Sequence, residues 1–215
     1  MGDLDKWNEA EEKLTEVLNN AFGKDGWVLN PGDGAFYGPK IDLKMEDALG
    51  REWQTGTIQL DYQLPERFDL TYVDETGAKV RPVMVHRTIY GSLERFIGVL
   101  IEHLGGAFPT WLAPIQVNII PVNNEYHLEY AKEIKDLLYN KGIRVALDDS
   151  NEKLNYRMRE SQTKKIPFTL ILGDKERDNN QISYRLFGHQ ETNTLSVDEF
   201  VSLLKKTIET KELLK

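Results

Sequence analysis

The chain has 215 residues, of which 40% are hydrophobic and 29% charged, enough for one large domain or two small ones with separate cores. Its net charge of −8 argues against broad, non-specific nucleic-acid binding but leaves room for a local basic face. No apolar run is long enough to span a bilayer, the acidic N-terminus lacks a signal-peptide core, and there is no cysteine. We therefore expect a cytoplasmic protein with no membrane partner.

The first elements in chain order are a helix and a long loop. Apolar residues spaced three and four apart predict a helix over residues 5–21. Residues 22–40 are rich in Gly, Pro and Asp, which predicts turns and loop.

Strands are expected next. Residues 41–46 alternate apolar and polar side chains, which predicts a half-buried strand, and a turn leads into a second strand over residues 51–62. Residues 67–74 and 82–85 are expected to continue the same sheet. The short turns between these strands favour antiparallel pairing.

A helix with one apolar stripe is predicted from Gly91 to a stop at Gly105–Gly106. The following stretch, AFPTWLAP, combines two prolines with a short run of apolar residues, and we place a domain boundary near Leu112. The expected domains are therefore residues 1–112 and 113–215.

Strands and helices alternate beyond this boundary, which implies a mostly parallel, covered sheet in a small α/β domain. The C-terminal helix begins with a capping box, Ser196 to Glu199. The other expected elements are strands over 115–122, 143–147, 168–173 and 182–188, and helices over 125–140 and 152–165.

The stretch VMVHRTIYGSLERFIG, residues 83–98, places charged groups beside apolar ones, which is costly unless they have partners. Gly91 lets the backbone pass close to a ligand at a helix start, Ser92 adds a hydroxyl, and Arg95 suits a phosphate or a flat base. The alternative is an ordinary strand-to-helix joint in which Ser92 caps the helix and Arg95 pairs with an acid such as Glu94.

Two further segments carry polar groups suited to a small ligand. Tyr37 and Lys40 flank a Gly-Pro pair, which alternatively forms a common turn. Gln54, Thr57 and Gln59 lie in the second strand, and such groups can bind ribose, adenine or an amino acid. Because Gln54 and Gln59 are five residues apart, sharing one pocket requires a β-bulge, with position 56 a glycine suited to it.

His86 alternates with apolar neighbours on its strand. A lone strand histidine is usually structural, and a zinc ligand needs two or three more donors, which the spacing of the other histidines does not supply.

The second domain carries the clearest basic patch, on the predicted helix 152–165, with a solvated helix face as the alternative. Asn151, Glu176 and Arg185 lie near strand or loop ends, where ligands of open α/β sheets bind. The basic residues are Lys153, Arg157, Arg159, Lys164 and Lys165.

Several motifs in order resemble the threonyl-tRNA synthetase family of class II aminoacyl-tRNA synthetases. The segment GSLERFIGVL resembles the third class II motif, and AFYGPKID, WQTGTIQLD, VMVHR, FPTWLAP, NEKL and GDKE resemble other parts of that family. The resemblance covers nearly the whole chain and favours the ligand-binding interpretation of residues 83–98. It implies an α+β and α/β fold class: part of an antiparallel class II catalytic sheet, then a mixed-sheet α/β anticodon-binding domain.

The resemblance also implies roles for individual residues. Arg95 would hold ATP, and Ser92, Gln54 and Thr57 would line the adenylate pocket. Tyr37, Lys40 and Gln59 would face threonine and the adenylate, and Arg95, Gln59 and Lys40 would be the catalytic set. His86 would be one zinc ligand. The residues that would read the threonine anticodon are Asn151, Arg159, Glu176 and Arg185.

The implied activity is threonine–tRNA ligation, with ATP and Mg²⁺, threonine and tRNA-Thr as substrates and partners. Zinc and a homodimer belong to the full-length enzyme. No segment resembles the first or second class II motif or supplies the other zinc ligands, so we expect poor catalysis by this chain alone. It corresponds either to a piece of a longer synthetase or to a short protein with only this half. In the second case an anticodon-binding module or a regulatory relative is the alternative function.

Overall fold

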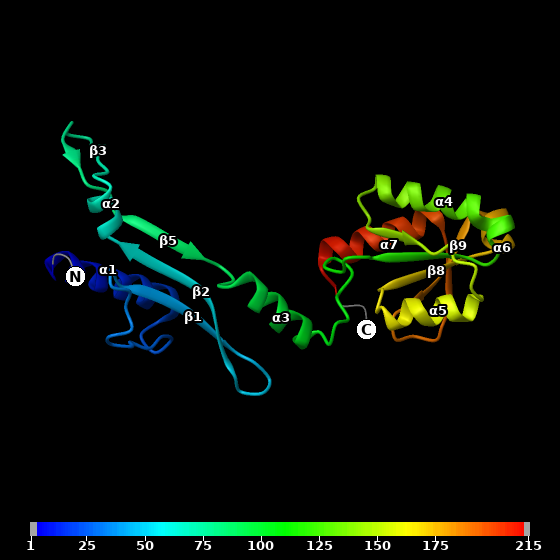
Figure 1. Ribbon diagram of the computed structural model, residues 1–215, viewed down its shortest axis with the longest axis horizontal. Helices are drawn as coiled ribbons and strands as arrows, with labels where there is room; N and C mark the ends of the chain where they lie inside the picture. Colours follow the sequence, from blue (N-terminus) through cyan, green and yellow to red (C-terminus); the bar gives the residue numbers. More distant parts are fainter. Residues whose placement is uncertain (1–3, 213–215) are drawn as a thin grey trace. The chain divides into compact units, whose positions relative to one another are not determined.

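The chain folds as two units with separate sheets, and the computed structural model describes residues 4–212. Unit 1 runs up to Val99 and unit 2 begins at Leu100 (Figure 1). The domain boundary near Leu112 stays a prediction. In the described part of the chain, no helix has the length and apolar character needed to cross a membrane.

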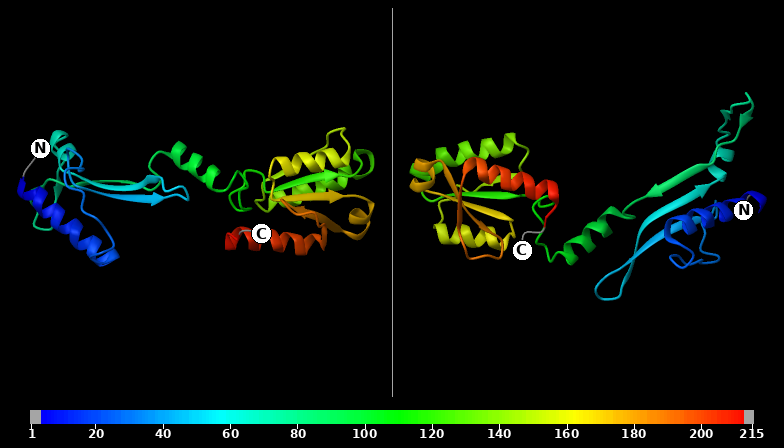
Figure 2. Two further views of the ribbon diagram at one scale, coloured as in Figure 1. Left: turned by 90° about the horizontal axis from the view of Figure 1, so that it is seen from below. Right: turned by 180° about the vertical axis from the view of Figure 1, so that it is seen from behind.

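Unit 1 contains the predicted N-terminal helix and an antiparallel sheet. Helix α1 spans Leu4–Phe22, and the strands β1 (Lys40–Glu46), β2 (Glu52–Asp61) and β5 (Met84–Thr88) pair in the order β1–β2–β5. The short helix α2 (Gln63–Arg67) follows β2. Figure 2 shows α1 along one side of the long β1–β2 hairpin. The predicted antiparallel pairing is confirmed.

The prediction that residues 67–74 continue this sheet is wrong. Strand β3 (Tyr72–Val73) pairs only with β4 (Lys79–Val80) in a separate two-stranded hairpin. The Asp74 carboxylate closes the turn by accepting bonds from the backbone N–H groups of residues 76 and 78. A local turn therefore competes with sheet extension.

The helix predicted from Gly91 to Gly105–Gly106 is confirmed as α3, Leu93–His103, and it ends before two glycines with positive φ. None of its side chains is buried, although it carries the expected apolar stripe. The apolar stripe of the first strand is also more open than expected, since Leu43 and Met45 are about half exposed (48% and 56%).

Unit 2 contains a five-stranded sheet in the order β10–β9–β8–β6–β7. The β6–β7 and β6–β8 pairings are parallel, whereas β8–β9 and β9–β10 are antiparallel, so the expectation of a mostly parallel sheet is corrected to a mixed sheet. The short helix α6 and the edge strand β10 are absent from the sequence-based elements. The bounds are β6 Val117–Pro121, α4 Asn124–Asn140, β7 Val145–Leu147, α5 Leu154–Thr163, β8 Phe168–Leu172, α6 Asp174–Asn179, β9 Gln181–Leu186, β10 Asn193–Ser196 and α7 Val197–Thr210.

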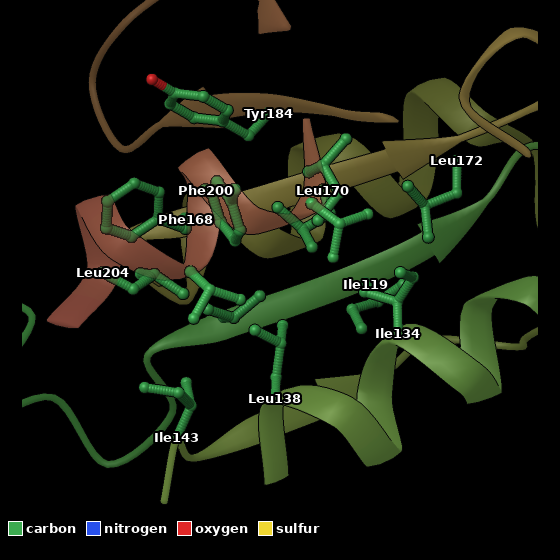
Figure 3. Close-up of a cluster of buried hydrophobic side chains, with 14 of the residues drawn as sticks. Ile119, Ile134, Leu138, Ile143, Phe168, Leu170, Leu172, Tyr184, Phe200 and Leu204 are labelled. Atoms are coloured by element: carbon green, nitrogen blue, oxygen red, sulfur yellow. The ribbon is translucent and has the colours of Figure 1, made fainter. Parts of the chain in front are cut away.

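The core of unit 2 lies between the sheet and helices α4 and α7. Ile119, Leu138, Phe168, Phe200 and Leu204 are among its buried side chains (Figure 3). Helix α5 covers the other face, so the sheet is sandwiched between helices (Figures 1 and 2). The predicted capping box at Ser196 starts α7, because Ser196 and Glu199 exchange side-chain and backbone bonds.

Candidate functional site

A β-bulge organises the polar face of the sheet in unit 1. Asp42 of β1 pairs with Thr57, but Lys44, two residues on, pairs with Gln54, three residues back on β2. The extra residue therefore lies in β2 at positions 55–56. The bulge expected beside Gly56 is confirmed, and it gives Gln54, Thr57 and Gln59 the same face.

The Asp42 carboxylate is the centre of a hydrogen-bonded network on this face. Its Oδ1 accepts from Gln54 Nε2 (2.8 Å) and Thr57 Oγ1 (2.9 Å), and its Oδ2 lies 2.7 Å from Lys40 Nζ. Gln54 Nε2 also donates to Thr57 Oγ1 at 3.0 Å. Because the amide nitrogen donates inside the network, the side-chain oxygen of Gln54 is left as an acceptor.

The same network sets the charge of Lys40. The hydrogen bond from Lys40 to Asp42 outweighs desolvation and, with the nearby Asp33 carboxylate, raises the pKa of Lys40 above its ordinary value. An ammonium group is therefore held at the start of β1.

Tyr37 joins this face from the loop before β1. Its hydroxyl donates to Gln59 Oε1 at 2.7 Å, and its ring lies edge-on to His86. Gly38 makes this possible: a Cβ there would lie 2.0 Å from the carbonyl oxygen of Leu60, so only glycine lets the loop lie against β2. The register places Lys40, Gln59 and His86 in one row across the three strands.

His86 is held by a buried carboxylate. Its Nε2 lies 2.9 Å from Asp61 Oδ2, and Asp61 Oδ1 accepts from the backbone N–H groups of Gln63 and Leu64. Burial opposes ionisation of Asp61, but these bonds prevail and lower its pKa. Among residues 4–212 no three His, Cys, Asp or Glu side chains gather as metal ligands.

The predicted ligand-binding segment of residues 83–98 lies against β2 through its backbone at Gly91. Gly91 has φ +64°, and a Cβ there would lie 2.9 Å from the carbonyl oxygen of Thr55 in the bulge. Ser92 Oγ donates to Glu94 and accepts from the N–H of Arg95, so Ser92 caps the start of α3. The Arg95 guanidinium is exposed and, within the described residues, forms no ion pair with Glu94 or another acid.

In unit 2 the residues predicted to bind the anticodon lie on different elements. Glu176 belongs to α6 and accepts from the backbone N–H of Gly173 (2.9 Å) and from Ser183 Oγ (2.6 Å). Arg185 lies two residues beyond Ser183 on β9; its Nη2 donates to Thr192 at 3.2 Å, while its buried Nε has no partner among the described groups. The structure thus links Glu176 to the strand that carries Arg185.

Asn151 and Arg159 are exposed, in the loop after β7 and on α5 respectively, and the structure provides no direct contact between them. The predicted basic patch on α5 is wrong for one residue, because Arg157 is only 3% exposed and donates to backbone carbonyls. The other four, Lys153, Arg159, Lys164 and Lys165, are on the surface, and Lys165 donates to the carbonyl oxygen of Gly105.

Sequence reasoning missed Asp42 and Asp61 as site residues. Asp42 was assigned only to the polar side of an alternating strand. The available signal was the bulge itself, because it aligns Gln54 and Thr57 with Asp42 rather than with solvent.

Comparison with known proteins agrees with this two-unit organisation. Residues 4–104 match the family described as tRNA synthetase class II core domain (G, H, P, S and T), and residues 116–207 match the anticodon binding domain family. The chain is 50% identical over 212 residues to a threonine–tRNA ligase of Clostridioides difficile and 51% identical over 209 residues to threonine–tRNA ligase 2 of Bacillus subtilis. These alignments cover 99% and 97% of this chain but only 33% and 32% of the relatives, so the chain spans about a third of their length.

Two solved structures are similar over nearly the whole chain. The crystal structure of the RNA binding domain of threonyl-tRNA synthetase from Cryptosporidium parvum matches with a TM-score of 0.86 and 40% identity, covering 96% of this chain and 52% of that one. A putative threonyl-tRNA synthetase from Aeropyrum pernix matches with a TM-score of 0.73 and 32% identity, covering 98% and 51%. With two adjoining family matches and threonine–tRNA ligases as relatives at about 50% identity, the chain belongs to the class II aminoacyl-tRNA synthetase family.

Proposed function

We propose that this chain serves threonine–tRNA ligation, with unit 1 contributing to the threonyl-adenylate site and unit 2 reading the anticodon of tRNA-Thr. In this reaction the threonine carboxylate attacks the α-phosphorus of ATP and pyrophosphate leaves. A terminal hydroxyl of the tRNA then attacks the threonyl carbonyl, and AMP leaves. The observation that carries the proposal is the polar face where Tyr37, Lys40, Gln54, Thr57 and Gln59 lie together.

Each group on this face has a defined chemical task. The Lys40 ammonium would neutralise charge near the phosphate, where a preoriented cation stabilises developing negative charge. The Tyr37–Gln59 pair would orient the amino acid, and the free oxygen of Gln54 would accept a hydrogen bond from the nucleoside. Arg95, exposed at the entry to α3, would bind ATP, with Ser92 holding that helix start in place.

Magnesium and zinc have different standing in this proposal. Mg²⁺ would accompany ATP and neutralise its phosphates. We place zinc in the threonine site of the longer relatives, with the residue equivalent to His86 as one ligand. The described residues do not supply the remaining zinc ligands. A homodimer and a cytoplasmic location complete the proposal for the longer enzyme.

A binding test distinguishes specific binding of the adenylate by unit 1 from non-specific binding. The chain would be titrated with a non-hydrolysable threonyl-adenylate analogue, threonyl-sulfamoyl-adenosine, and backbone amides would be followed by NMR. Shifts should cluster at β1, β2 and the start of α3. Gln54→Glu should weaken binding because a second carboxylate would face Asp42, whereas Glu52→Gln, on the same strand but paired with exposed Lys44, should not. Uniform or absent shifts in the unmodified chain would refute this part.

A second candidate function is anticodon binding without catalysis, and it is favoured by the match of residues 116–207 to the anticodon binding domain family. Groups such as Asn151, Arg159, Glu176 and Arg185 suit the edges of unstacked bases. Binding to a threonine anticodon stem-loop together with no adenylate-analogue binding would favour this module over the ligase role.

A further inference from the structure

A buried arginine on α5 bridges the ends of two parallel strands. Arg157 is 3% exposed, its Nη2 donates to the carbonyl oxygen of Pro121 at 2.7 Å, and its Nη1 donates to that of Asp148 at 3.0 Å. Pro121 is the last residue of β6, and Asp148 follows the last residue of β7. The two carbonyls therefore lie at the carboxyl edge of the parallel pair, where ligands of such sheets bind.

The loop after β7 is tied down at further points. Asn124 of α4 donates from Nδ2 to the carbonyl oxygen of Asp149 at 2.7 Å. The Asp148 carboxylate accepts from the backbone N–H and the hydroxyl of Ser150, at 3.1 and 2.6 Å. Asn151, the next residue, is exposed at the end of this fixed segment.

If stability were its only role, a buried Arg157 would be an unfavourable choice for holding this loop. Within residues 4–212 it forms no ion pair, and its Nε is buried without a partner. A buried charge without a carboxylate carries a large desolvation cost, and an apolar side chain of similar volume often stabilises such a position better. The guanidinium fork, however, reaches two carbonyls with a fixed geometry that no apolar group can reproduce.

We propose that Arg157 is a positioning residue that fixes the loop of residues 148–151 against the end of β6 and so presents Asn151 to an RNA anticodon base. This inference rests on the proposed anticodon-reading function of unit 2. Arg157 itself does not touch the RNA, because its side chain is buried beneath the loop.

The test uses the full chain and two fluorescent RNA stem-loops, one with a threonine anticodon and one with a substituted anticodon, at one stated salt concentration. Fluorescence anisotropy gives the affinity for each. Arg157→Met should weaken binding of the cognate loop about tenfold, the size of one lost base contact, and change binding of the substituted loop little. Arg157→Lys should fall between, since an ammonium keeps the charge but not the fork. Lys164→Met removes an exposed charge at the C-terminal end of the same helix and should leave the ratio of the two affinities unchanged.

The outcomes separate the inference from the function beneath it. If the unmodified chain prefers the cognate loop and Arg157→Met retains the full preference, or loses affinity for both loops equally, the positioning role is overturned while anticodon reading stands. If the unmodified chain has no preference, anticodon reading fails and the inference falls with it. Should Arg157→Met not fold by circular dichroism, Arg157→Lys decides by the same ratio. NMR relaxation of residues 149–151 in the free protein should show increased motion in either variant, and unchanged relaxation would also overturn the role.

Discussion

Replacing Asp42 with asparagine should show how strongly one carboxylate orders the polar face of unit 1. The exchange keeps the size and one acceptor but removes the charge beside Lys40. Lys40 and Asp42 are 2.7 Å apart with side chains 18% and 14% exposed, a pair between a surface and a buried one. We expect a loss of about 1–2 kcal/mol in the free energy of unfolding of unit 1. Asp42→Ala should cost more, about 2–4 kcal/mol, because Gln54 and Thr57 also lose their acceptor.

The pH dependence gives a second readout with a definite sign. Asp42 raises the pKa of Lys40 in the folded chain, so this stabilisation is present below the ordinary lysine pKa and is lost as the pH rises through the higher folded value. Asp42→Asn should bring the Lys40 pKa down and flatten this alkaline loss. Lysine side-chain NMR from about pH 9 to 12 measures the first effect, and amide hydrogen exchange in β1 and β2 measures the second.

Glu52→Gln is the matched control for this experiment. Glu52 pairs with Lys44 on the same two strands at 3.1 Å, but both side chains are more than half exposed, so the loss should stay below about 0.5 kcal/mol. Equal effects of Asp42→Asn and Glu52→Gln, or an unchanged Lys40 pKa, would show that Asp42 does not organise this face.

Three further substitutions test other parts of the structure. Gly91→Ala should destabilise unit 1 by about 1–3 kcal/mol, because residue 91 has φ +64° and a Cβ would meet a β2 carbonyl oxygen; hydrogen exchange in β2 measures the loss. Asp61→Asn should reduce the sensitivity of unit 1 to acid. Burial raises the pKa of Asp61, but bonds from the α2 backbone and His86 outweigh burial and lower it. The stabilisation is therefore present above the ordinary carboxyl pKa and is lost as the pH falls through the lowered value, which acid unfolding curves measure. Phe200→Ala should cost unit 2 about 3–5 kcal/mol in urea unfolding while leaving β1–β2 exchange unchanged.

Periodic apolar patterns predicted the elements that bury a face. Helices α1, α4 and α7 and the strands β6 and β8 follow directly from spacings of three, four or two residues, or from unbroken apolar runs. Helix α6 was missed because its sequence, DKERDN, has no apolar residue and begins through the Glu176 contact with the Gly173 N–H instead. Strand β3 was assigned to the wrong sheet because two-residue strands carry almost no pattern.

The chemistry of particular side chains predicted more of the site than periodicity did. The bulge followed from asking how Gln54 and Gln59 could share one face, and the structure has it at Gly56. The burial of Arg157 could not be predicted in this way, because an arginine on a polar helix usually faces solvent. Its position depends on carbonyls at residues 121 and 148, which only the folded sheet brings together.

The two units differ in what holds their functional groups. Unit 2 has a core of buried aromatic and aliphatic side chains, whereas Ala10, Pro39 and Pro65 are the buried apolar side chains among the described residues of unit 1. With so little apolar burial, order on the polar face of unit 1 must come largely from hydrogen bonds, and Asp42 and Asp61 each accept three of them on this face. In each case the three donors come from two elements: β1 and β2 for Asp42, and α2 and β5 for Asp61. These carboxylates therefore act as the local substitute for a core, which is why an alternating-pattern argument that looks only for apolar residues overlooks both.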